Sequence, residues 1–335
     1  MSNIPDTTDI RFMRRALQLA QGGLGHVSPN PMVGCVVVST DGQIIGEGWH
    51  RHYGHAHAEV NAINSIPGDL TKLLSQSTVY VTLEPCSHFG KTPPCVDLLV
   101  RSDVRRVVIG CIDPFGKVNG TGVEKLRNAG IEVTTGVLKE QCESLNARFF
   151  TAHTLHRPFV TLKWAQSADG FMDSERKANS SPARFSKDTG MLAVHRLRAH
   201  HDAIGVGSGT ILADKPRLDV RYWVGDNPRR VVFDRRGRVV NPIGELFEVL
   251  GDLYLQGITS LLVEGGPTLL RAFISAGLWD LARIETAPLI LSAKGRAKAP
   301  ELAIAPFMHE DIGGNDVSYF SNNSLVNAFF VEHGL

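Results

Sequence analysis

The sequence predicts an α/β protein of two domains, and three observations support this prediction. The chain has 335 residues, more than one compact core usually takes. Helix-like and strand-like stretches alternate along both halves, which is typical of α/β folds with a partly parallel sheet. Between Leu145 and Pro158 this pattern loosens into a polar stretch that contains histidines. We therefore expect a domain boundary there, with domains at residues 1–148 and 157–335.

The first domain should begin with a helix whose apolar residues recur at helical spacing, at Met13, Ala16, Leu17 and Ala20. A hairpin should follow, because two β-rich runs, 33–39 and 43–48, are joined across Asp41-Gly42. Beyond the hairpin, helix-like segments alternate with strand-like segments as far as Thr135. Helices are expected at 57–65, 94–101 and 122–128, and strands at 78–84, 105–111 and 131–135.

The second domain shows the same alternation, starting with a strand at Phe159. Further strands are expected near 203–206, 230–234, 260–264 and 282–287, and helices near 189–199 and 267–276. The sequence contains no internal repeat and no low-complexity segment.

The composition favours an enzyme that acts on a small molecule. The net charge is +1 with no basic run, which argues against a nucleic-acid partner. No window approaches the eighteen or so apolar residues of a membrane span, and the first fifteen residues do not resemble a secretory signal, so we expect a cytoplasmic protein. Five cysteines are too few and too odd in number for a disulfide framework. Three of them, Cys35, Cys111 and Cys142, lie in apolar contexts typical of core thiols.

The other two cysteines and one histidine predict a catalytic zinc site. His57 lies in His-Ala-His-Ala-Glu, and Cys86 and Cys95 follow after a predicted strand. Three protein ligands leave the fourth position of zinc open for water, whereas structural zinc is closed by four. Cys95 follows Pro93-Pro94 at a predicted helix start, which should also lower the pKa of its thiol.

Glu59, which is not needed as a ligand, is the expected proton carrier. Residues two apart do not share a helix face, so His57 and Glu59 can converge only around a site beyond the helix N-terminus. There Glu59 could take a proton from the zinc-activated water, give it to a ring nitrogen and later protonate departing ammonia. This is hydrolytic deamination of an amidine-like carbon. His55 and His88 are expected to line the pocket rather than bind metal.

The cysteine spacing narrows the family. Nucleobase deaminases usually carry Pro-Cys-x-x-Cys, whereas eight residues separate Cys86 from Cys95 here. The strings 30–34 (NPMVG), 56–60 (AHAEV) and 82–95 (TLEPCSHFGKTPPC) closely resemble the RibD family of bifunctional riboflavin biosynthesis proteins. The resemblance implies a cytidine-deaminase-like, three-layer α/β/α first domain, with one Zn²⁺ per chain on His57, Cys86 and Cys95 and proton transfer by Glu59. It also implies a homodimer.

The same resemblance suggests two substrate contacts in the first domain. Asn30 would contact the pyrimidine substrate, and Lys91 would contact its ribose phosphate as a point charge. For both residues a role without substrate binding stays open, in which Asn30 stabilises a turn and Lys91 is a solvated surface lysine.

The second domain resembles the reductase domain of the family, which is similar to dihydrofolate reductase in fold and uses NADPH. The likeness rests on segments 160–170, 197–199, 230–234 and 263–269. It assigns substrate binding to Lys163, Arg198, Leu218, Arg221 and Glu264. It assigns cofactor binding to Ala165, Thr210, Asp214, Gly266, Pro267, Thr268, Leu269, Leu270, Arg271 and Ala272. Glycines between a strand and a helix suit phosphate at the helix N-terminus.

The second domain also departs from the family. Phe171 stands where Lys or Arg is usual after Asp-Gly, and Arg-Phe-Ser at 184–186 stands where Trp-Ile-Thr is usual. Only 29 residues separate Asp234 from Glu264, whereas the family has a few dozen more, including a strand and a loop for the adenosine phosphate of the cofactor. Three arginines, at 235, 236 and 238, could substitute for that loop or form a solvated basic turn.

The expected activity is therefore twofold. The first domain would deaminate 2,5-diamino-6-ribosylamino-4(3H)-pyrimidinone 5′-phosphate, and the second would reduce the resulting 5-amino-6-(5-phosphoribosylamino)uracil with NADPH. In the alternative, the shortened second domain has the reductase fold but only binds substrate or dimerises. A nucleic-acid deaminase would need a basic groove with stacking aromatics, and the first domain shows neither.

Overall fold

The computed structural model describes residues 7–89, 93–115, 120–175, 183–234 and 245–335. The chain divides into two compact units, Met1–Thr154 with Glu332–Gly334, and Leu155–Val331 with Leu335. Each unit contains a β-sheet with helices on both faces, which confirms the predicted α/β fold class.

Unit 1 contains the elements α1 (Thr7–Ala20), β1 (Gly34–Val38), β2 (Ile44–Trp49), α2 (Ala58–Asn64), β3 (Thr78–Leu83), α3 (Cys95–Arg101), β4 (Arg106–Cys111), α4 (Thr121–Asn128), β5 (Glu132–Thr135), α5 (Lys139–Leu145) and α6 (Ala147–Leu155).

The sheet of unit 1 places the ends of two parallel strands at one edge. Its strand order is β2-β1-β3-β4-β5. Strand β1 is antiparallel to β2, as the hairpin predicted, and to β3, whereas β3, β4 and β5 are parallel. Because neighbouring parallel strands end at the same edge, the residues that follow β3 and β4 lie close together. These are the segments that contain Cys86 and Asp113.

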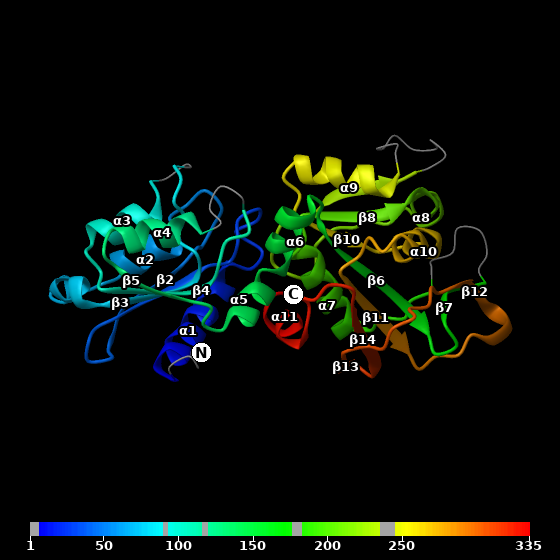
Figure 1. The fold of residues 1–335 in the computed structure, drawn as a ribbon. Coiled ribbons are helices and arrows are strands. Elements are labelled where there is room, and N and C mark those ends of the chain that lie inside the picture. The colour runs from blue at the N-terminus through cyan, green and yellow to red at the C-terminus, as the bar shows by residue number, and fades with distance from the viewer. Residues whose placement is uncertain (1–6, 90–92, 116–119, 176–182, 235–244) are drawn as a thin grey trace. The chain divides into compact units, whose positions relative to one another are not determined.

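Helices cover both faces of this sheet (Figure 1). Helices α2, α3 and α4 pack on one face, where Ala62, Leu99 and Leu126 join the buried strand residues in one core cluster. Helix α1 lies on the other face so closely that a Cβ on Gly34 would be 1.9 Å from the carbonyl oxygen of Ala16. Cys35, Cys111 and Cys142 are free and buried, as expected of core thiols.

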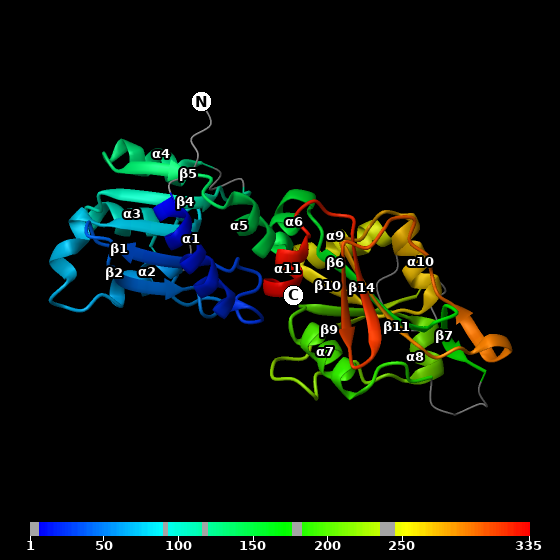
Figure 2. The ribbon, with the colours of Figure 1, turned by 90° about the horizontal axis from the view of Figure 1, so that it is seen from below.

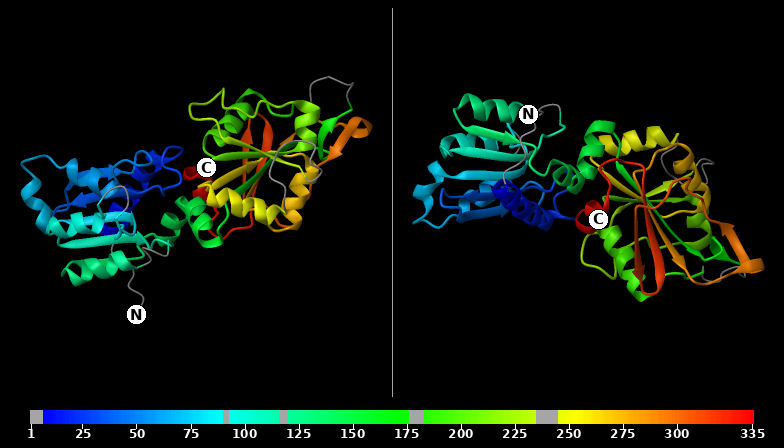
Figure 3. Two further views of the ribbon diagram at one scale, coloured as in Figure 1. Left: turned by 90° about the horizontal axis from the view of Figure 1, so that it is seen from above. Right: turned by 60° about the horizontal axis from the view of Figure 1, so that its bottom comes forward.

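Unit 2 is built around a larger, mostly parallel sheet in the order β13-β14-β11-β6-β10-β8-β9. Its strands fan out with the usual twist (Figure 3), and α7 and α10 lie on opposite sides (Figure 2). A separate small sheet pairs β7 with β12. The elements are β6 (Phe159–Ser167), β7 (Phe171–Ser174), α7 (Asp188–Ala199), β8 (Ala203–Gly207), α8 (Ser208–Asp214), β9 (Arg229–Phe233), α9 (Leu246–Leu255), β10 (Ser260–Val263), α10 (Pro267–Ser275), β11 (Leu281–Ala287), β12 (Gly295–Lys298), β13 (Met308–Ile312), β14 (Asn315–Ser321) and α11 (Ala328–His333).

The segment that we expect to be shorter than in the family follows the edge strand β9 along the chain. Strand β9 ends the sheet order, and the chain then reaches α9 and β10. Residues 245–259, which the structure describes in full, contain one helix and no strand. The arginines at 235, 236 and 238 lie outside the described residues.

The loosened pattern after Leu145 is a helix in the structure, α6, and not an irregular stretch. Ala147, Phe150, Thr151 and Ala152 are buried on it. Their apolar signal is diluted by polar neighbours such as His153, which explains why the helical period was missed. Among the helices that the structure describes, none has both the length and the apolar character needed to span a bilayer.

A buried ion pair anchors the start of β6. The guanidinium of Arg157 donates two hydrogen bonds to Asp280, at 2.6 and 3.0 Å, and the backbone N–H of Val160 donates a third at 2.7 Å. The side chains of Arg157 and Asp280 are 9% and 2% exposed. Removing one partner of such a pair leaves the other charge buried without compensation.

We expect Asp280→Ala to lower the free energy of unfolding of unit 2 by about 3–5 kcal/mol, measured by urea unfolding. Glu175→Ala is the matched control, because it breaks the exposed pair between Glu175 and Arg296 and should cost less than about 1 kcal/mol. Equal effects of the two substitutions would contradict the anchoring role of Asp280.

Candidate active site

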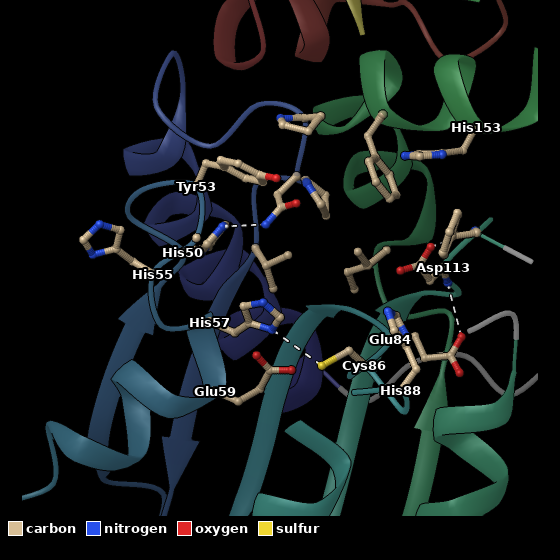
Figure 4. Close-up of a pocket in the computed structure, with 18 residues that line it drawn as sticks. His50, Tyr53, His55, His57, Glu59, Glu84, Cys86, His88, Asp113 and His153 are labelled. Carbon is tan, nitrogen blue, oxygen red and sulfur yellow. Dashed lines mark hydrogen bonds between the residues drawn. The ribbon is translucent and has the colours of Figure 1, made fainter. Parts of the chain in front are cut away.

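The three predicted zinc ligands meet at the N-terminal ends of two helices. His57 is the residue immediately before α2, Cys86 follows β3, and Cys95 is the first residue of α3. The Nδ1 atom of His57 lies 3.5 Å from Sγ of Cys86 and 3.3 Å from Sγ of Cys95. Figure 4 shows His57 and Cys86 facing each other beside Glu59.

This arrangement fits a tetrahedral zinc ion. With Zn–S and Zn–N bonds of about 2.3 and 2.0 Å, a nitrogen and a sulfur on one tetrahedral zinc would be about 3.5 Å apart, close to the distances observed. Among the residues that the structure describes, these three form the one His, Cys, Asp or Glu group close enough to hold a metal ion. The ligand set is rich in sulfur and nitrogen, which zinc prefers.

The two cysteine thiols differ in acidity. The Cys95 thiol hydrogen-bonds the sulfur of Cys86, which with nearby His57 lowers the pKa of Cys86 to about 4. The same hydrogen bond and burial raise the pKa of Cys95 well above its ordinary value. The pKa of Cys95 is therefore raised and not lowered, contrary to the prediction from its place at a helix start. The backbone N–H at that helix start donates to the sulfur of Cys86, at 3.2 Å, and so lowers the pKa of Cys86 instead.

Glu59 lies in the first turn of α2, next to the ligands and inside the pocket. It is 3% exposed. Burial, followed by the charge of Cys86, raises the pKa of Glu59 above its ordinary value. A carboxylate with a raised pKa can both accept and release a proton near neutral pH, which suits a general acid–base role.

A cavity of about 350 Å³ opens over this group. His55 and His88 line it, as expected, and Asn30 does too. Several residues that the sequence did not single out also line it: His50, Tyr53, Glu84, Asp113, Phe115, Phe149 and His153. Glu84 lies in the string 82–95 that carries the family resemblance, which is the signal available for it. Asp113 follows the predicted strand 105–111, and Phe149 and His153 lie on α6, which the sequence pattern does not predict.

Burial and hydrogen bonding fix the polarity of Asn30. Nδ1 of His50 lies 3.1 Å from the carbonyl oxygen of Ala56, so Nδ1 must carry the proton. Burial lowers the pKa of His50, which keeps the ring neutral and makes Nε2 an acceptor. The Asn30 amide nitrogen donates to this Nε2 at 3.1 Å. Lys91, the other predicted substrate contact, lies outside the described residues.

In unit 2 the predicted substrate residues form a connected network. Arg198 donates to both carboxylate oxygens of Glu264, at 2.8 and 2.7 Å, and to the backbone carbonyl of Asp219, at 3.1 Å. Asp219 pairs in turn with Arg221, and Leu218 beside it is buried. Burial opposes ionisation of Glu264, but Arg198 and Lys163 lower its pKa overall. Burial lowers the pKa of Lys163.

The predicted cofactor residues gather where β8 and β10 end. Gly207 donates its N–H to the carbonyl oxygen of Gly265, at 2.9 Å, and Gly266 and Pro267 begin α10. A Cβ on Gly266 would lie 3.3 Å from Oγ1 of Thr210, so these segments are adjacent. Free backbone at a helix N-terminus fits a phosphate group of NADPH.

The other residues assigned to the cofactor differ in their surroundings. Leu270 is fully buried in the core of unit 2, so the predicted contact with the cofactor would have to come from its backbone. Arg271 donates to the backbone carbonyls of Lys298 and Ala299. The remaining members lie on β6, at the end of α8 and in the first turns of α10: Ala165, Asp214, Thr268, Leu269 and Ala272.

Two sequence departures have structural explanations. Phe171 packs against β12, where a Cβ on Gly295 would lie 2.4 Å from the Phe171 ring. Ser186 donates to buried Glu285 at 2.9 Å, and Asn315 donates to the same carboxylate at 2.7 Å. These contacts attach the segment before α7 to the sheet.

Two family comparisons match the two units. Residues 6–111 match the family described as cytidine and deoxycytidylate deaminase zinc-binding region, and residues 158–303 match the RibD C-terminal domain. The riboflavin biosynthesis protein RibD of Aquifex aeolicus is 39% identical, over 84% of this chain and 88% of that protein. RibD of Escherichia coli is 35% identical, over 86% and 90%.

Solved structures agree with these relatives. RibD of Acinetobacter baumannii superposes with a TM-score of 0.85 at 33% identity, covering 94% of this chain and 98% of that one. A Thermotoga maritima protein described as a diaminohydroxyphosphoribosylaminopyrimidine deaminase/5-amino-6-(5-phosphoribosylamino)uracil reductase gives 0.82 at 34% identity, with the same coverage. One chain thus contains a deaminase-type zinc site in unit 1 and a RibD-type C-terminal domain in unit 2. The chain belongs to the RibD family of riboflavin biosynthesis proteins.

Proposed function

We propose that this chain catalyses two reactions of riboflavin biosynthesis. Unit 1 would deaminate 2,5-diamino-6-ribosylamino-4(3H)-pyrimidinone 5′-phosphate, and unit 2 would reduce 5-amino-6-(5-phosphoribosylamino)uracil with NADPH. The observation that carries the proposal is the convergence of three zinc-type ligands and buried Glu59 in one pocket. The names of the relatives support the substrates.

In the deaminase site, Zn²⁺ held by His57, Cys86 and Cys95 would activate a water molecule for attack at the amino-bearing carbon. Glu59 takes the proton released by this water and delivers it to the adjacent ring nitrogen. It then takes the proton of the newly added hydroxyl group and transfers it to the amino group, so that the C–N bond breaks, ammonia leaves and the C–OH group becomes a carbonyl. The raised pKa of Glu59 suits both directions of transfer.

Side chains around the cavity orient the pyrimidine. Because the Asn30 amide nitrogen is used by His50, its oxygen is left to accept an N–H from the substrate. Phe115 and Phe149 give the cavity an apolar wall for the ring. Lys91 would meet the phosphate.

In unit 2, NADPH would supply a hydride to C1′ of the ribosylamino group and become NADP⁺. The C1′–O4′ bond of the sugar ring would break, and O4′ would take up a proton from water to give the ribitylamino product. Gly266, Thr210 and the first turn of α10 would hold the cofactor phosphates. Arg198, Arg221 and Lys163 would bind the ribosyl phosphate, with Glu264 holding Arg198 in place.

We expect the deaminase to comprise residues 1–148 and the reductase to comprise residues 157–335. As the family resemblance implies, we also expect two copies of the whole chain to form a homodimer. Light scattering of the purified protein should therefore give twice the mass of one chain. A mass equal to one chain would remove the dimer from the proposal.

Glu59→Gln should abolish deamination while the protein still binds one zinc ion per chain, because the amide cannot carry the proton and the three ligands are intact. Ammonia release and zinc content measure the two effects. The control Glu140→Gln changes an exposed acid in the first turn of α5 and should keep both. Retained ammonia release by Glu59→Gln would contradict the role of Glu59 as the proton carrier. Absence of zinc from the unmodified protein would contradict the proposed zinc site.

The pure protein should oxidise NADPH when it is given the deaminated intermediate, followed by loss of nicotinamide absorbance. Arg198→Gln should raise KM for the intermediate roughly ten- to a hundredfold, because a charge-assisted hydrogen bond is lost. Arg196→Gln on the same helix is the matched control and should leave KM unchanged. No NADPH loss at high enzyme concentration would restrict the activity to deamination.

A further inference from the structure

Glu84 is a buried carboxylate at the deaminase pocket that the steps above do not use. It follows β3 directly, is 3% exposed, and is separated from the ligand Cys86 by one proline. Figure 4 shows its side chain directed toward Asp113 and away from His57. It is therefore placed to act on the ligand Cys86 through the chain, not on the substrate.

Glu84 accepts backbone N–H groups at both oxygens. Its Oε1 accepts from Gly122 and Val123, at 2.8 and 3.3 Å, and its Oε2 accepts from Gly120 and Asp113, at 2.9 and 3.3 Å. Three of these donors belong to the start of α4, where N–H groups have no partner within the helix. The positive end of the helix dipole compensates the buried negative charge.

The backbone packs closely around this contact. A Cβ on Gly122 would lie 2.4 Å from the carbonyl oxygen of Pro85 and 3.0 Å from Oε1 of Glu84. Only glycine lets the first turn of α4 come this near to the segment that carries Cys86.

The other side of Cys86 is attached to the same helix. The hydroxyls of Ser87 and Thr121 lie 2.5 Å apart, and the ammonium of Lys125 donates to the carbonyl oxygen of Ser87 at 2.6 Å. Cys86 thus lies between two attachments to α4. Its own carbonyl oxygen accepts from Val96 of α3, at 3.2 Å.

We propose that Glu84 is the positioning residue of the zinc site, holding Cys86 at the distance from His57 and Cys95 that zinc requires. The inference rests on the proposed zinc site of unit 1. Residues that orient metal ligands typically contribute ten- to a hundredfold to metal affinity. A glutamine at this position would turn an N–H₂ group toward two N–H donors, so that one half of the contact would be lost.

The test is zinc affinity, measured by competition with a chromogenic chelator. Glu84→Gln should weaken zinc binding about ten- to a hundredfold relative to the unmodified protein. Glu124→Gln is the matched control, because it removes an exposed acid from the first turn of the same helix, and its affinity should stay unchanged. Unchanged affinity in Glu84→Gln would overturn the proposal.

The rise in melting temperature on adding zinc separates positioning from general stability. If Glu84 positions Cys86, the zinc-induced rise should be smaller in Glu84→Gln than in the unmodified protein. An equal zinc-induced rise, on a melting temperature that is lowered both with and without zinc, would overturn the proposal.

If Glu84→Gln does not fold, the zinc affinity of Glu84→Asp tests the proposal instead, because the shorter side chain keeps the charge but cannot reach both Gly120 and Gly122. Unaltered zinc affinity in that variant would overturn the proposal as well. Lack of zinc binding by the unmodified protein would instead contradict the proposed zinc site.

Discussion

The deaminase site depends on one constraint: helices α2, α3 and α4 all begin at the same edge of one sheet. The parallel pairing of β3 with β4 produces this edge. Each helix start then has a different use, since α2 contributes His57 and Glu59, α3 contributes Cys95, and α4 binds the carboxylate of Glu84. The N–H groups at the starts of α3 and α4 donate to the sulfur of Cys86 and the carboxylate of Glu84, which favours negative charge on these two side chains.

The sequence was sufficient for the parts of this site that lie close together along the chain. The order of His57, Glu59, Cys86 and Cys95, with a strand between them, indicates the metal and the reaction. The difference in pKa between Cys86 and Cys95 could not be predicted, because it depends on which sulfur the N–H of Cys95 faces in space. The role of Glu84 was hidden for a similar reason, since its partners lie 29 to 39 residues further along the chain.

In unit 2, family resemblance identified residues but not their relations. Arg198 and Glu264 were each expected to bind substrate, yet the structure shows that they pair with each other across 66 residues. Leu270 was assigned to the cofactor by its place in a glycine-rich turn, whereas one face of that helix packs into the core. The departure at Ser186 became interpretable only once Glu285, on a distant strand, was found beside it.

The hydrogen bond between His50 and Asn30 has a consequence for the chemical selectivity of the pocket. The tautomer of His50 is set by the carbonyl oxygen of Ala56, and the tautomer sets the orientation of the Asn30 amide. The main chain at Ala56, acting through the neutral imidazole of His50, therefore determines that Asn30 presents its acceptor oxygen to the pocket. No side-chain substitution at Ala56 removes that carbonyl oxygen. The outward direction of the Asn30 amide oxygen is therefore determined by the backbone conformation at Ala56 and not by Asn30 alone.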